Sequence, residues 1–201
     1  MKTVLRLITL FAVVAMLIPP TMSMAAGPTD LVKETIDGVI KILRDPSLKG
    51  PAKTEARRLK LRERIQERFS FEEMAMRSLG KHWKGRSEGE KKEFVEVFGT
   101  LIENSYVSKI EGYTDEEVIY DGEIVKDDAS EVKTKIVTKS GTEIPINYRL
   151  KNNNGDWQVY DVIIEGVSLI RNYRSQFNEA LNTSSFTELV KQLKEKTRPQ
   201  G

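Results

Sequence analysis

Few side chains of this sequence have the types and the spacing that catalysis requires. His82 is the single histidine, it lies in the polar stretch GKHWKG, and the chain contains no cysteine. Because zinc and related metals are bound mainly by imidazole and thiolate groups, we expect no transition-metal site. The sequence also lacks the GxSxG, P-loop and GxGxxG motifs of nucleophilic and nucleotide-dependent enzymes. It therefore predicts no catalytic residues, no metal and no cofactor.

One pair of residues has the types needed for acid–base chemistry. Tyr160 and Asp161 lie in the apolar stretch WQVYDVII, and a carboxylate beside a phenol in an apolar cup can move protons. However, neighbouring residues of a strand point to opposite faces of the sheet, so the two side chains are not expected to share a site. We favour a structural acid at Asp161, paired with Arg174 or with backbone N–H groups where the next helix begins.

The strand that carries Asp161 is apolar on both faces. Strict alternation places Trp157, Val159 and Ile163 on one face, and Tyr160, Val162 and Ile164 on the other. An antiparallel sheet packed on one side usually keeps its other face polar. The pattern therefore predicts a central strand whose second face is covered by helices or by a ligand.

The elements around this strand follow a helix–sheet–helix order. Helical periodicity and Ser-x-x-Glu capping boxes predict helices over about 28–112 and about 167–197. Between them, alternating apolar residues and short turns rich in Gly and Asn predict a four-stranded antiparallel meander over about 116–165. This order predicts an α+β fold.

Residues 1–25 have the pattern of a secretory signal peptide. Basic residues precede an apolar run from Leu7 to Ile18, and the small residues Ser23 and Ala25 fit cleavage before Ala26. The run is shorter than the roughly 20 residues that a membrane-spanning helix needs. We therefore expect a cleaved signal and a mature protein in the periplasm.

The remaining chain, residues 26–201, is expected to form a single domain. Removing the signal peptide removes two basic residues and no acidic one, which balances the 30 acidic residues of the whole chain with as many basic ones. A balanced charge does not favour nucleic acid as a partner. Without cysteine, the exported fold must be held together by packing and not by disulfides.

Three stretches of the chain resemble a known family. FSFEEMAMRSLGKHW, FVEVFGTLIENSY and WQVYDVIIEGVSLIRNYRSQF are similar to the MlaC family of periplasmic phospholipid carriers, also called the toluene-tolerance auxiliary-component family. The similarity runs from about Asp30 to Leu193. It implies an NTF2-like, cystatin-like α+β fold that encloses a hydrophobic cavity for the acyl chains of a phospholipid.

The resemblance also implies partners. Members of this family are expected to shuttle phospholipid between an outer-membrane lipoprotein–porin complex and an inner-membrane ABC transporter with an MCE-domain ring, and so to maintain the lipid asymmetry of the outer membrane. The positions that match the family motif are Asp161, Gly166, Ser168, Tyr173 and Arg174. We interpret them as mainly structural, because they lie where the strand turns into the following helix.

A phospholipid site would be lined by apolar side chains from the sheet and from the helices that close over it. The expected lining residues are Tyr106, Ile136, Ile146, Tyr148, Val162, Ile164, Val167 and Ile170. An error of one residue in a strand face would exchange lining residues for core residues. Two alternatives stay open: a cup-shaped enzyme of the same fold that acts on an apolar small molecule, and a periplasmic adaptor with a filled core and no ligand.

A helix expected over about residues 54–68 carries an excess of positive charge. Its basic residues are Arg57, Arg58, Lys60, Arg62, Arg64 and Arg68, against Glu55, Glu63 and Glu67. One interpretation is a solvated face with ion pairs between residues one helical turn apart. The other is that exposed arginines steer the protein towards acidic partner surfaces or anionic head groups.

Overall fold

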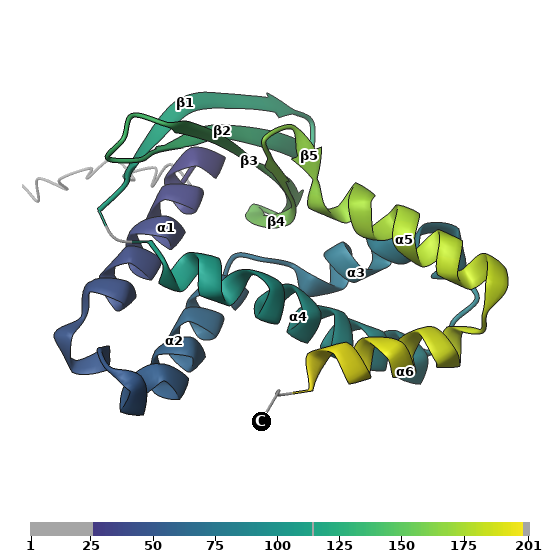
Figure 1. Cartoon of the computed structure of the whole chain (residues 1–201). Helices are drawn as coiled ribbons and strands as arrows, with labels where there is room; N and C mark the ends of the chain where they lie inside the picture. The colour runs from purple at the N-terminus through teal and green to yellow at the C-terminus, as the bar shows by residue number, and fades with distance from the viewer. Residues whose placement is uncertain (1–25, 114, 199–201) are drawn as a thin grey trace, which may run out of the picture.

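The fold is a five-stranded antiparallel sheet with helices before and after it (Figure 1). The computed structural model describes residues 26–113 and 115–198, and the predicted signal peptide lies outside these residues. The helices are α1 (Pro28–Arg44), α2 (Thr54–Gln66), α3 (Phe71–Leu79), α4 (Glu88–Glu111), α5 (Leu169–Thr183) and α6 (Phe186–Thr197). The strands are β1 (Glu117–Lys126), β2 (Ala129–Val137), β3 (Glu143–Asn153), β4 (Asp156–Ile164) and β5 (Val167–Ser168).

The predicted α+β class and antiparallel meander are confirmed, with the strands in the order β1-β2-β3-β4-β5. The fifth strand is a two-residue extension that the sequence pattern did not separate from the corner before α5. The turn between β3 and β4 consists of Asn154 and Gly155, with φ of 55° and 95°. Positive φ at both central residues is the requirement of the tightest hairpin turn, which Asn-Gly meets at low cost.

β4 is central, as predicted. It pairs with β3 and β5, and the backbone of Val159 also binds the segment that precedes α3. Val159 donates its N–H to the carbonyl of Arg68 at 2.8 Å and accepts the N–H of Ser70 at 2.9 Å. α3 and α5 both contact this strand, so it is buried from several sides.

The predicted alternation along β4 is wrong, because the strand contains a β-bulge. Leu150 of β3 lies opposite Val159, whereas the preceding Arg149 lies opposite Asp161. Tyr160 therefore has no partner residue opposite it on β3. The side chains after Tyr160 lie on the face opposite to the one that strict alternation from Val159 would give them. As a result, Val162 points to the same face of the sheet as Val159.

The helices form an aromatic core away from the sheet. Phe94 of α4 stacks on Phe98 with ring centroids 5.8 Å apart, and it meets Phe177 of α5 edge to face at 5.6 Å. Phe186 of α6 completes the cluster at 6.0 Å from Phe94. Phe94 and Phe98 have no exposed surface, so this core rigidly joins α4, α5 and α6.

A second core joins α1 to the sheet. Val32 of α1 packs against buried side chains of three strands, namely Val132, Leu150, Trp157 and Val159. α1 thus covers one part of the sheet, and Figure 1 shows α4 running beneath the sheet beyond it.

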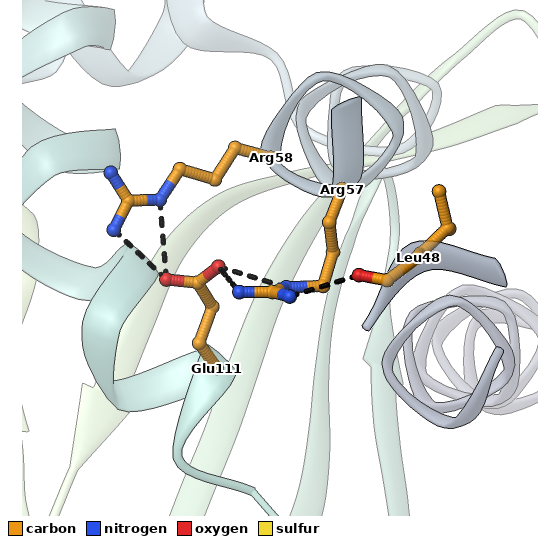
Figure 2. A network of polar contacts seen from close by, with 4 residues as sticks. All are labelled: Leu48, Arg57, Arg58 and Glu111. Carbon is orange, nitrogen blue, oxygen red and sulfur yellow. Dashed lines mark hydrogen bonds and ion pairs between the residues drawn. The ribbon is translucent and has the colours of Figure 1, made fainter. Parts of the chain in front are cut away.

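α2 is held mainly by ion pairs. Of its residues, all of which are described, Leu61 alone is buried. Glu111 at the end of α4 accepts hydrogen bonds from both Arg57 and Arg58, and Arg57 also donates to the carbonyl of Leu48 at 3.0 Å (Figure 2).

Three further arginines extend this pattern to the rest of the molecule. Arg62 pairs with Glu103 of α4, Arg64 with Glu34 of α1, and Arg68 with Asp156 of β4. The arginines are therefore tied largely to acidic residues of other elements. Arg64 also pairs with Glu67 one helical turn further on, so the predicted pairs along one helix account for only part of the contacts. The role of the more exposed arginines in docking stays a prediction.

Candidate functional site

The candidate site is an apolar face of the sheet that α1 covers only in part. Side chains directly opposite each other in an antiparallel pair lie on one face. The register aligns three rows across the strands, namely Val118–Ile136–Ile144, Tyr120–Thr134–Ile146–Ile164–Val167 and Val132–Tyr148–Val162. We call these side chains the apolar face.

The apolar face continues the core beneath α1 but is less enclosed. Val132 is fully buried, and Tyr120, Tyr148 and Val162 pack against the same core together with Ile36 of α1. All residues of the apolar face except Val132 and Thr134 remain partly accessible. Such a continuous strip of partly exposed aliphatic and aromatic side chains is what a site for an apolar ligand requires.

Tyr148 shows how deep this face lies. Burial raises the pKa of its hydroxyl to about 12, yet its side chain is not sealed off. Tyr148 is therefore largely enclosed by protein and keeps some accessible surface. The raised pKa also keeps the phenol neutral at physiological pH, so no charge is present at this point of the face.

The structure places six of the eight predicted lining residues on one face of the sheet. Ile136, Ile146, Tyr148, Val162 and Ile164 all lie on the apolar face. Val167 lies opposite Ile164 at the edge of this face and is 62% exposed.

The other two predicted lining residues belong to the aromatic core of the helices. Tyr106 of α4 packs against that core, where burial raises the pKa of its hydroxyl. Ile170 is 4% exposed within the same core.

Several residues of the apolar face were not among the predicted lining residues. They are Val118, Tyr120, Val132, Thr134 and Ile144. The alternation of Val118 and Tyr120 and of Ile144 and Ile146 is visible in the sequence. The predicted meander places β1 next to β2, but the register that aligns these side chains on one face follows only from the structure, in which β1 has an irregularity between Tyr120 and Gly122.

Asp161 has a structural environment. It is 3% exposed, and it accepts the N–H of Ile170 at 3.0 Å and the hydroxyl of Ser168 at 2.7 Å. Ser168 in turn accepts the N–H of Arg171 as the N-cap of α5. The expected contact with a backbone N–H is therefore confirmed, because the carboxylate binds donors that the first turn of a helix leaves free.

The cation near Asp161 differs from the predicted one. Arg149 lies 3.7 Å from the carboxylate, whereas Arg174 donates to the carbonyl of Arg77. With both oxygens of Asp161 engaged, this residue holds the corner between β4 and α5 and is not free to act as a base.

The described residues contain no cluster of acidic, histidine or cysteine side chains suited to a metal ion. His82 lies with its Nε2 atom 3.2 Å from Oδ1 of Asn178, at the packing contact between α5 and the turn after α3. No described helix is both long and apolar enough to cross a membrane.

A family model and two known proteins match this chain in sequence. The family model described as MlaC protein matches residues 33–195. The intermembrane phospholipid transport system binding protein MlaC of Haemophilus influenzae is 21% identical over 190 residues, which are 92% of this chain and 89% of that protein. A toluene tolerance protein of Pseudomonas putida is 34% identical over 50 residues, 25% of this chain and 23% of that protein.

A solved structure shares the fold. The phospholipid-binding protein of Ralstonia solanacearum, determined in complex with a phospholipid, aligns with a TM-score of 0.77 and 22% sequence identity. The alignment covers 86% of this chain and 97% of that chain. The arrangement of the sheet and the helices is therefore common to both proteins.

Proposed function

Because this chain belongs to the MlaC family, whose model matches residues 33–195, we propose that it is a carrier that binds a phospholipid and moves it between membranes. The observation that carries this proposal is the apolar face, a partly open strip of aliphatic and aromatic side chains beneath the sheet. The relative from Ralstonia solanacearum, which has the same fold, is a phospholipid-binding protein.

Acyl chains gain enough from such a surface to stay bound during transfer through water. Burial of one CH₂ group contributes about 0.8 kcal/mol, so two chains of roughly 15 carbons contribute on the order of 20 kcal/mol relative to water. A bilayer offers the chains a similar gain. Exchange with a membrane complex is therefore close to balance and needs no nucleotide bound to the carrier, so the direction of transport is set by its partners.

Members of the MlaC family are lipid-binding transport proteins and not enzymes, and the same holds for this protein. The residue that best fitted an acid–base role, Asp161, instead caps α5.

The location and the partners are further parts of the proposal. We place the mature protein, residues 26–201, in the periplasm as a single phospholipid-binding domain after cleavage of the signal peptide. Its partners are an outer-membrane lipoprotein–porin complex and an inner-membrane ABC transporter with an MCE-domain ring. The curated relative from Haemophilus influenzae, which is named as the binding protein of a transport system, supports this placement.

Lipid content tests the proposal directly. Protein purified from its native compartment without detergent should carry phospholipid in a fixed ratio, measured by mass spectrometry of the extracted lipids. Val162→Arg places a charge opposite Tyr148 on the apolar face, and a charge in contact with hydrocarbon is costly. We expect this variant to lose at least nine-tenths of its lipid, roughly the effect of 1.4 kcal/mol or more.

A matched control separates this effect from a general disturbance of the sheet. Ile124 of β1 is 57% exposed and lies opposite Glu131, outside the apolar face. Ile124→Arg should retain the lipid of the wild type, while circular dichroism shows that both variants are folded. Wild-type protein without phospholipid, or a folded Val162→Arg variant with unchanged lipid, would contradict the proposal.

A further inference from the structure

Tyr120 has a hydroxyl group without a partner. The side chain lies on the apolar face opposite Thr134, packs against the core beneath α1, and carries Lys33 over its ring at 5.4 Å. Its hydroxyl oxygen is buried and forms no hydrogen bond with any residue that the structure describes. Leaving a buried hydroxyl unpaired is costly, and such groups in native proteins usually have a function or a missing partner.

The chemistry of this hydroxyl restricts what it can bind. Burial, together with the nearby carboxylate of Asp37, raises the pKa of Tyr120 well above its ordinary value. The phenol therefore keeps its proton at physiological pH and acts as a hydrogen-bond donor, so its partner must be an acceptor.

The charges around the hydroxyl favour a neutral acceptor over an anion. Lys33, the cation nearest to the ring, is paired with Asp37 at 2.9 Å, so the pair offers no net positive charge to a phosphate. An anionic group would also lose its hydration against the apolar side chains of this face. In a phospholipid, the first acceptors next to the hydrocarbon chains are the ester carbonyls, which are neutral.

We propose that Tyr120 binds the lipid by donating a hydrogen bond from its hydroxyl to an acyl ester carbonyl. This inference rests on the proposed function, since it requires a lipid on the apolar face. This hydrogen bond fixes how far the acyl chains extend along β1. Apolar burial alone has no direction and does not fix that position. Lipids whose chains are joined by ether bonds lack this acceptor.

Competition between ester and ether lipids tests the contact. Protein stripped of lipid is offered equal amounts of a diacyl phospholipid and a dialkyl ether phospholipid with the same head group and chain length, and bound lipid is quantified by mass spectrometry. Wild-type protein should prefer the ester lipid about fivefold, the effect of one hydrogen bond of about 1 kcal/mol. Tyr120→Phe should bind both lipids equally, at the level of the ether lipid in the wild type.

Tyr160→Phe is the matched control. Tyr160 belongs to the same sheet, but its ring packs against the aromatic core of the helices. The guanidinium carbon of Arg77 lies 3.9 Å from the centroid of this ring. This variant should keep the preference of the wild type. Equal binding of the two lipids by wild type, or a preference that survives in Tyr120→Phe, would overturn the inference and leave the proposed function intact. Failure of the wild type to bind either lipid would overturn both.

Stability provides a second measurement that a purely structural tyrosine would not match. Because the hydroxyl of Tyr120 is unpaired without ligand, its removal should leave the lipid-free protein at least as stable as the wild type. The same substitution should weaken lipid binding. A Tyr120→Phe variant that is destabilised without lipid would show that the hydroxyl serves the fold and would overturn the assignment.

Discussion

Replacing Glu111 with glutamine tests whether ion pairs hold α2 in place. Glu111 accepts four hydrogen bonds, two each from Arg57 and Arg58. The side chains of Glu111 and Arg57 are 13% and 18% exposed, whereas that of Arg58 is 34% exposed. Glutamine keeps the shape of the side chain and one acceptor but removes the charge, so the packing of α4 is preserved.

The magnitude follows from these exposures. Breaking a mostly enclosed charge-assisted contact costs about 1.5–3 kcal/mol, which applies to Arg57. A more exposed pair contributes about 0.5 kcal/mol, which applies to Arg58. Because glutamine retains one acceptor, we expect Glu111→Gln to lower the free energy of unfolding by about 2 kcal/mol at pH 7.

The measurement is urea denaturation of lipid-free protein, since bound lipid would add its own stabilisation. The control is Glu103→Gln on the same helix, where the pair with Arg62 is more open, with side chains 21% and 44% exposed. We expect this control to lose less than about 1 kcal/mol. Equal losses in the two variants, or a loss below about 0.5 kcal/mol for Glu111→Gln, would refute the view that enclosed ion pairs anchor α2.

The pH dependence gives an independent test. Partial burial acts to raise the pKa of Glu111, but the hydrogen bonds from Arg58 and Arg57 outweigh it and hold the pKa below its ordinary value. A carboxyl with a lowered folded-state pKa stabilises the fold only while it is ionised. The advantage of the wild type over Glu111→Gln should therefore be complete above the ordinary glutamate pKa of about 4.3 and vanish as the pH falls through the folded-state pKa.

Three further substitutions test how local geometry positions the elements. A Cβ atom at Gly38 of α1 would lie 2.3 Å from Nε of Arg64, so Gly38→Ala should displace that arginine and destabilise the protein by about 1 kcal/mol, despite the higher helix propensity of alanine. Gly89→Ala in α4, where a Cβ meets nothing within 4 Å, should instead raise the melting temperature slightly. Asp161→Asn removes the charge that binds the N–H of Ile170, and urea denaturation should show a loss of about 2 kcal/mol; an unchanged midpoint would argue against the capping role.

The sequence alone determined the features that depend on neighbours a few residues away. Ser70 and Ser87 cap α3 and α4 by accepting an N–H three residues ahead, and the Asn154–Gly155 turn adopts the positive φ values that its residue types favour. Each of these interactions joins residues only a few positions apart, so the residue types that form it can be read directly from the sequence. The α+β class and the shared face of the predicted lining residues in β2, β3 and β4 are marked by the same kind of pattern, apart from the bulge in β4.

Tertiary structure alone decided the features that join distant segments. The bulge at Tyr160 reverses the faces of β4 because Arg149 and Leu150 of the neighbouring strand pair with Asp161 and Val159, and no local pattern marks the extra residue. The partner of Arg57 lies 54 residues away. Whether a charged or apolar side chain is solvated, paired or ligand-binding depends on which remote element comes to lie against it, and that is set by the packing of the whole chain.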